Sequence, residues 1–93
     1  MLNQVILVGR LRSFEDFGVL IEVPRPEKDA GSDLIPCALV GNIASNTKEY
    51  CNTNDIIGIK GRLESQGVSM MVKVDKVTFL SSSRTNEDTE GGE

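Results

Sequence analysis

Apolar and polar residues alternate along most of this chain, and short clusters of turn-forming residues interrupt the alternation. β-Branched residues recur within the alternating stretches, which is typical of strands with one buried face. We expect strands at about residues 3–12, 17–23, 34–41, 55–64 and 69–80. A charged loop at residues 25–33 and a tight turn at residues 65–67 should separate neighbouring strands.

One segment has a helical pattern instead. Ile43, Thr47 and Tyr50 fall roughly on one face of a helix running from about Ile43 to Cys51. Asn42 is a suitable N-cap, and Asn52 and Asn54 can end the helix. Three strands, one helix and two further strands are the order of the five-stranded Greek-key barrel called the OB-fold. The pattern therefore predicts an all-β OB-fold with one short helix.

Two of the apolar strands carry the same Gly-Arg-Leu tripeptide, at Gly9–Leu11 and again at Gly61–Leu63. A glycine within a strand marks a bulge or a place where two backbones approach closely. Two such strands in a short chain indicate a sheet that curls into a barrel.

The 93 residues can enclose only one modest core. We expect an OB-fold domain at residues 1–80 and a disordered acidic tail at residues 81–93. The tail has no apolar residue from Thr85 onward, and it holds four of the 14 acidic residues, namely Glu87, Asp88, Glu90 and Glu93. The rest of the chain is therefore close to neutral, and the overall charge of −4 does not argue against a nucleic-acid partner.

Several classes of protein are not expected from this composition. No apolar stretch approaches the roughly 20 residues of a membrane helix, so we predict a cytoplasmic protein with no membrane partner. Cys37 and Cys51 occur without histidine or a C-x-x-C spacing, so we expect reduced, partly buried thiols and no metal. Without histidine, a Gly-x-Gly-x-x-Gly segment or a Walker-type loop, we expect neither an enzyme nor a cofactor.

The first eleven residues, MLNQVILVGRL, resemble the opening of bacterial and phage single-stranded DNA-binding (SSB) proteins. Leu34–Asn42 resembles the third strand of that family, and Gly41–Leu63 keeps the family's helix and fourth-strand spacing. Val77–Leu80 is typical of the fifth strand. The resemblance covers nearly all of residues 1–80 and identifies the chain as a short, divergent member of the SSB family.

The resemblance implies largely sequence-independent binding of single-stranded DNA in replication, recombination or repair, by a protein associated with the nucleoid. It also implies a homo-oligomer, a dimer or tetramer with the first strand, Leu2–Leu11, at the interface, and replication proteins as candidate partners. The chain departs from the family in having Leu34 and Val40 where third-strand stacking aromatics stand, and in its shorter loops. Each stacking contact contributes about 1–3 kcal/mol, so we expect weaker binding over fewer nucleotides.

Alternation along the strands suggests which cations face outward. If Val5, Leu7 and Leu11 point inward, Arg10 and Arg12 point outward; if Ile57, Ile59 and Leu63 point inward, Lys60 and Arg62 point outward on an adjoining strand. The candidate phosphate contacts are Arg10, Arg12, Lys60, Arg62, Lys73, Arg25 and Lys28. Arg10, Lys60 and Arg62 are favoured, because neighbouring strands can direct their charges onto one phosphate path.

The four aromatic residues divide into two pairs. Phe14 and Phe17 flank a turn; one is expected to plug the mouth of the barrel, and either is a candidate stacking platform for a base. Phe79 is expected in the core, and Tyr50 is expected to pack the helix onto the barrel's end.

A second hypothesis belongs to a different class of protein. An SSB-like OB-fold with weak or no DNA affinity would act as a protein-assembly subunit, including a primosome-type accessory protein. Changing Arg10, Lys60 and Arg62 to Glu should abolish DNA binding under the first hypothesis and leave the assembly size unchanged.

Overall fold

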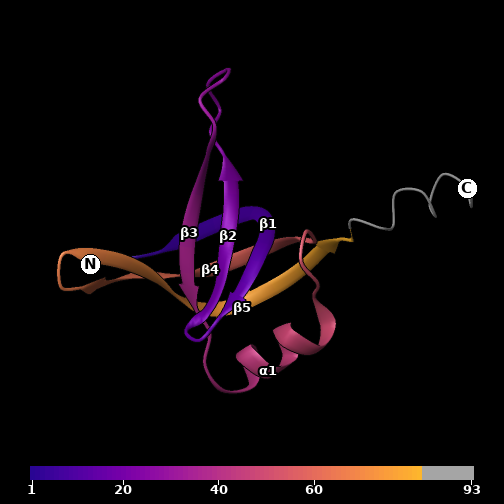
Figure 1. Ribbon diagram of the computed structural model, residues 1–93. Helices are drawn as coiled ribbons and strands as arrows, with labels where there is room; N and C mark the ends of the chain where they lie inside the picture. The colour runs from indigo at the N-terminus through magenta and orange to yellow at the C-terminus, as the bar shows by residue number, and fades with distance from the viewer. Residues whose placement is uncertain (83–93) are drawn as a thin grey trace, which may run out of the picture.

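The computed structural model describes residues 1–82, so the predicted acidic tail lies outside the described residues from residue 83 onward. The elements along the chain are β1 (Val5–Glu15), β2 (Gly18–Pro24), β3 (Ser32–Ala38), α1 (Gly41–Tyr50), β4 (Ile56–Gln66) and β5 (Ser69–Ser81) (Figure 1). This is the predicted order of elements. Within residues 1–82, no helix has the length and apolar character that crossing a membrane requires.

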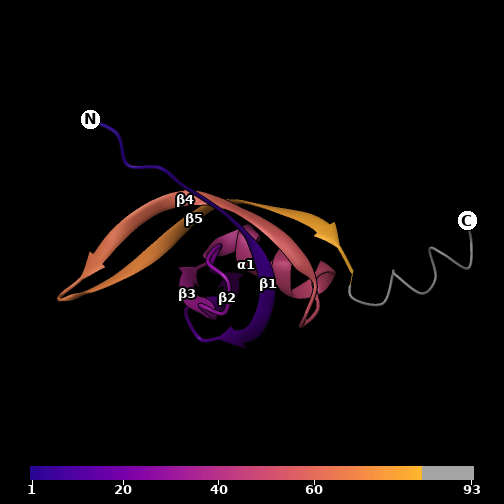
Figure 2. The same cartoon turned by 90° about the horizontal axis from the view of Figure 1, so that it is seen from above.

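The strands close into a barrel in the order β1-β2-β3-β5-β4, and only the β3–β5 pair is parallel. β1 belongs to both halves of the barrel, because Val5–Arg10 pairs with β4 whereas Arg10 and the residues after it pair with β2. Seen from above, β4 and β5 arch together over one side of the barrel and their hairpin extends beyond it (Figure 2). The predicted OB-fold barrel is confirmed.

The core lies inside the barrel and is made by the inward residues of every strand. The buried apolar side chains are Leu11, Val19, Ile21, Cys37, Leu39, Cys51, Ile57, Ile59, Val72 and Val74. Both cysteines are free thiols, as expected. Burial raises the pKa of Cys37 to about 12, so this thiol stays protonated and behaves as a small apolar residue.

The repeated glycines have the role that the sequence indicated. A Cβ atom on Gly9 would collide with the carbonyl oxygen of Glu22, and one on Gly61 would collide with the carbonyl oxygen of Lys73. The β4–β5 register also shifts beside Gly61, where Lys60 pairs with Lys76 but Gly61 pairs with Val74. The two glycines therefore let backbones meet where the sheet curls.

Some predicted boundaries are wrong. The N-cap of α1 is Val40 rather than Asn42 and makes no side-chain cap hydrogen bond; Gly41, with φ of 58°, turns the chain into the helix before Asn42. β3 ends at Ala38 rather than at residue 41. The β4–β5 turn follows Gln66, since Gln66 pairs with Ser69 and Gly67 takes φ of 67°.

Leu63 was expected to point into the core, but its side chain is 43% exposed. It follows Gly61 on the side of β4 that bears Ile59, so its position in the alternation is inward. β4 pairs with β1 only as far as Gly61, so Leu63 lies on the part of β4 that pairs with β5 alone. The β4–β5 hairpin extends beyond the barrel (Figure 2).

Candidate nucleic-acid interface

Four cations form two cross-strand pairs on the outer side of the β4–β5 hairpin. Lys60 lies directly opposite Lys76, and Arg62 lies directly opposite Lys73. Lys60, Lys76 and Arg62 are exposed and Lys73 is half-buried, while Ile59, Gly61, Val72 and Val74 between them are buried. We call Lys60, Arg62, Lys73 and Lys76 the cation ladder.

The charge of the cation ladder is only partly balanced. Arg62 forms an ion pair with Glu64 at 3.2 Å. Within residues 1–82, no ion pair involves Lys60, Lys73 or Lys76. Like charges placed directly opposite each other in a sheet are destabilising. The ladder is therefore a surface with uncompensated positive charge, which an anion would relieve.

The ladder also reaches the face of the barrel that OB-folds use for oligonucleotides, which is centred on the second and third strands. Lys73 pairs with Ala38 of β3, and Ala38 pairs with Gly18 of β2, so the three residues form one row across the sheet. A strand of DNA lying along β2 and β3 would meet Lys73 and Arg62 at the edge of that face.

Lys76 was not among the candidate cations, and it lies beside a bulge. Simple alternation from the buried Val72 and Val74 would direct Lys76 inward. Asp75 is the extra residue in the register shift, so the alternation reverses there and Lys76 comes to face Lys60. The adjacent charges of Asp75 and Lys76, which interrupt the alternation of apolar and polar residues in β5, are the one signal that could have located this bulge.

Arg10 and Arg12 make contacts of a different kind. Arg10 Nη1 donates a hydrogen bond to the backbone oxygen of Asn54 at 2.9 Å, and Arg12 Nη1 donates one to Asn54 Oδ1 at 2.9 Å. Arg12 Nε also pairs with Glu22 at 3.1 Å. Asn54 has φ of 79°, so the two guanidinium groups hold a loop with left-handed backbone between α1 and β4.

Arg10 lies apart from Lys60 and Arg62, and their convergence on one phosphate path stays a prediction. Arg10 is paired with Ile56 of β4, whereas Lys60 is paired with Ile6 of β1. Four residues of strand separate the two positions, which corresponds to about 13 Å. The structure brings Lys60, Arg62 and Lys73 together and leaves Arg10 and Arg12 as a separate group.

The other two candidate cations lie in the loop between β2 and β3. Arg25 donates to Asp33 Oδ1 through Nε at 3.0 Å and Nη2 at 2.7 Å, and this hydrogen-bonded ion pair lowers the pKa of Asp33. The charge of Arg25 is thus balanced by the carboxylate of Asp33 in the same hairpin. Lys28 is exposed in the same loop.

The aromatic side chains follow the expectations only in part. Phe14 packs against the core and Phe17 is half-buried, so neither is an exposed platform. Tyr50 and Phe79, which were expected to pack onto the barrel and into the core, are 68% and 49% exposed; those two predictions are wrong. Tyr50 is the last residue of α1, and Phe79 lies near the end of β5, so the barrel covers neither ring fully.

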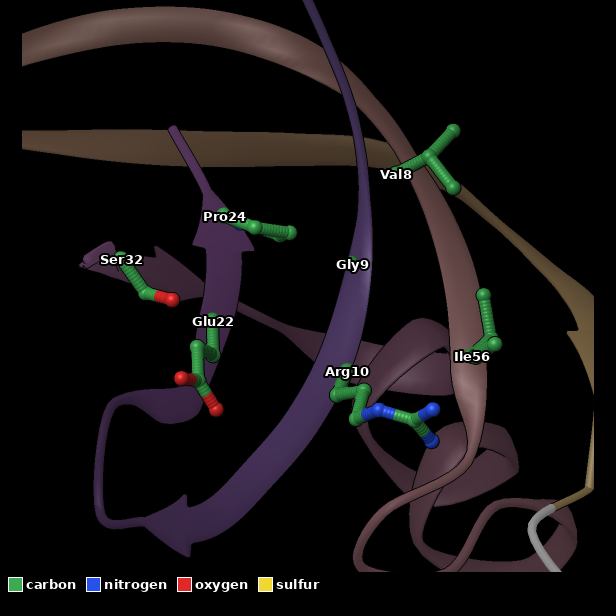
Figure 3. Close-up of a pocket in the computed structure, with 7 residues that line it drawn as sticks. All are labelled: Val8, Gly9, Arg10, Glu22, Pro24, Ser32 and Ile56. Carbon is green, nitrogen blue, oxygen red and sulfur yellow. The ribbon is translucent and has the colours of Figure 1, made fainter. Parts of the chain in front are cut away.

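A pocket opens where β1 and β2 are no longer paired, before Arg10 on β1 and after Glu22 on β2 (Figure 3). It is lined by Val8, Gly9, Arg10, Glu22, Pro24, Ser32 and Ile56.

The start of β1 has an unpaired edge beside this pocket. Val5–Val8 pair with β4 on one edge only, and no strand of residues 1–82 pairs with their other edge. The side chains of Ile6 and Val8 on this segment are 70% and 54% exposed.

Comparison with known proteins identifies the family. No family model matches the chain. Single-stranded DNA-binding protein B of Bacillus subtilis is 32% identical over an alignment of 103 positions, which covers 86% of this chain and 91% of that protein. The SSB domain of a Synechococcus sp. protein has a TM-score of 0.68 at 18% identity, covering 84% of this chain and 96% of that one. The mitochondrial single-stranded DNA-binding protein of S. cerevisiae has a TM-score of 0.70 at 12% identity, covering 87% and 97%. The two structures share the fold, and the similarity to the B. subtilis protein shows that this chain belongs to the family of single-stranded DNA-binding proteins.

Proposed function

We propose that this protein binds single-stranded DNA, largely without regard to sequence, and acts by binding rather than catalysis in DNA replication, recombination or repair. Membership of the SSB family and the OB-fold barrel support this function. The observation that carries it is the cation ladder, in which two like-charged pairs stand next to each other and three of the four cations have no ion pair within residues 1–82. Phosphate groups would supply the missing negative charge.

Binding through the ladder should be weak at high salt. Neutralising one phosphate of a single strand contributes about −0.7 to the slope of log affinity against log salt. Four ladder cations per subunit therefore predict a slope of about −3 per subunit. Since no exposed aromatic residue stands on β3, phosphate contacts should contribute a larger share of the affinity than stacking.

We also propose self-association into a dimer or tetramer through the first strand, Leu2–Leu11. The unpaired edge of Val5–Val8 can extend the sheet into a second copy, and the exposed side chains of Ile6 and Val8 would be covered by that contact. The proposed setting is the cytoplasm, on the nucleoid, with replication proteins as partners.

The proposed function is tested by fluorescence anisotropy of a labelled oligo-dT, titrated with the protein at low and near-physiological salt. We expect saturable binding that weakens as salt rises. A Lys60→Gln/Lys73→Gln double variant should bind more weakly and lower the salt slope by about 1.4. Lys60→Gln alone should lower the slope by about 0.7. Its matched control is Lys48→Gln, which removes one charge outside the ladder and should change little.

Two results would count against the proposal in different ways. Equal losses in Lys60→Gln and Lys48→Gln would mean that net charge, rather than the ladder, determines affinity. No binding at low salt by an intact oligomer would favour the protein-assembly subunit, for which the exposed Ile6 and Val8 would be the main functional surface.

A further inference from the structure

A groove between α1 and β5 contains the two most exposed aromatic side chains. The chain has one tyrosine, three phenylalanines and no tryptophan. Tyr50, at the end of α1, and Phe79, near the end of β5, both line this groove. Tyr50 is 68% exposed and Phe79 is 49% exposed, whereas Phe14 and Phe17 are half-buried.

The same groove is continuous with the cation ladder through one residue. Lys76 lines the groove and is also the cross-strand partner of Lys60. Binding of single strands combines cations that follow the phosphates with aromatic faces on which bases stack. In residues 1–82, the α1–β5 groove is where an exposed aromatic pair and an unpaired ladder cation occur together.

We propose that the α1–β5 groove is a binding site for unstacked bases of single-stranded DNA, which would stack on Tyr50 and Phe79 while their phosphates contact Lys76 and Lys60. This inference rests on the proposed function. It places the stacking contacts on the helix side of the barrel, outside the β2–β3 face that OB-folds use for oligonucleotides.

The polar residues of the groove fit a base better than a phosphate. Asp75 lines the groove, and its carboxylate would repel a phosphate that entered it. A carboxylate accepts hydrogen bonds from the N–H groups of bases, and the amide of Asn46, also in the lining, can donate and accept. The phosphates are therefore kept on the Lys76 side of the groove and the bases point inward.

Tyr50 gives a direct readout, because it is the only tyrosine in a chain without tryptophan. Its emission is recorded as unlabelled oligo-dT is added, and the anisotropy of a labelled oligo-dT is measured with the same protein. We expect Tyr50 emission to be quenched in step with binding, since a base stacks on the ring.

Substitutions separate stacking from general packing. Tyr50→Leu and Phe79→Leu should each weaken oligo-dT binding by about tenfold, which corresponds to one stacking contact. Tyr50→Phe keeps the ring and should bind as the unchanged protein does. Phe17→Leu, at the turn between β1 and β2, is the control and should leave affinity unchanged. Circular dichroism and light scattering confirm that each variant keeps its fold and its assembly size.

The outcomes distinguish this inference from the proposed function. If oligo-dT binds but Tyr50 emission is unchanged and both leucine variants bind normally, the groove is not the base site and the proposed function stands. If Tyr50 emission changes with protein concentration in the absence of DNA and does not change when oligo-dT is added, a second copy occupies the groove. That result would overturn the inference. If no oligo-dT binds at low salt, both fail.

Discussion

Lys60 and Lys76 face each other at a position where opposite charges or apolar residues would stabilise the sheet. Directly opposed like charges cost roughly 0.2–1 kcal/mol. Removing one of them, by Lys76→Gln, should therefore raise the free energy of unfolding by up to about 1 kcal/mol. The same change should weaken oligo-dT binding and lower the salt slope by about 0.7. Urea unfolding and fluorescence anisotropy measure the two effects.

A suitable control is Lys48→Gln on α1, because Lys48 lies outside the ladder and among residues 1–82 has no ion pair to lose. Neither stability nor affinity should change in this variant. A Lys76→Gln protein that is less stable than its parent, with unchanged DNA affinity, would mean that Lys76 stabilises the fold rather than binding phosphate.

Single residues could be predicted from the sequence where the strands are regular. Alternation correctly directed Leu11, Ile57 and Ile59 into the core. It failed at Leu63, because the strand continues past the barrel. It would also have misplaced Lys76, because a bulge reverses the facing of the side chains there. Strict alternation contains no information about either event, since both depend on how the partner strand is registered.

At the level of elements, barrel closure depends on glycines that differ in what surrounds them. Gly61 has no room for a Cβ atom, which would collide with the backbone oxygen of Lys73. Gly58, three positions earlier on β4, has its nearest neighbour at 3.7 Å, which is ordinary contact. We expect Gly61→Ala to lower the free energy of unfolding by about 1–3 kcal/mol or more, because backbone must move to accommodate the methyl group.

Gly58→Ala provides the matched comparison on the same strand. It should be neutral or stabilising by about 0.5–1 kcal/mol, because alanine loses less conformational freedom on folding than glycine. Thermal unfolding of both variants is the measurement. Equal destabilisation would show that both glycines are required by the conformation of β4, and not by the close approach of β5 at Gly61.

The order of the elements was predictable because each strand and the helix has its own periodicity, separated by residues that favour turns. The site was less predictable. Arg10 and Arg12 have the residue type and spacing of phosphate contacts, yet both donate to Asn54 in a loop more than 40 positions away. A sequence pattern does not reveal that such a hydrogen-bond acceptor lies within reach.

At the scale of the whole molecule, the ladder and the unpaired edge of β1 lie on the same sheet. Ile6 of β1 pairs with Lys60 of β4, which pairs in turn with Lys76 of β5. If two copies join through the β1 edge, each contributes its own ladder to one extended sheet. Two linked sites bind one strand more tightly than either alone, because the second contact becomes intramolecular.

Assembly through β1 can therefore be tested with DNA binding as a second readout. Val8→Glu introduces a charge at a position that is 54% exposed in the single chain, so folding should be retained while association is disrupted. We expect light scattering to give a lower mass than for the parent. Compared with the parent, the variant should lose more affinity for a long oligo-dT than for a short one, because the second ladder is lost.

Val68→Glu, at the fully exposed tip of the β4–β5 hairpin, is the control and should retain the parent's mass. A reduced mass for Val68→Glu alone would move the interface from β1 to the hairpin, and the ladders of neighbouring copies would then no longer share a sheet.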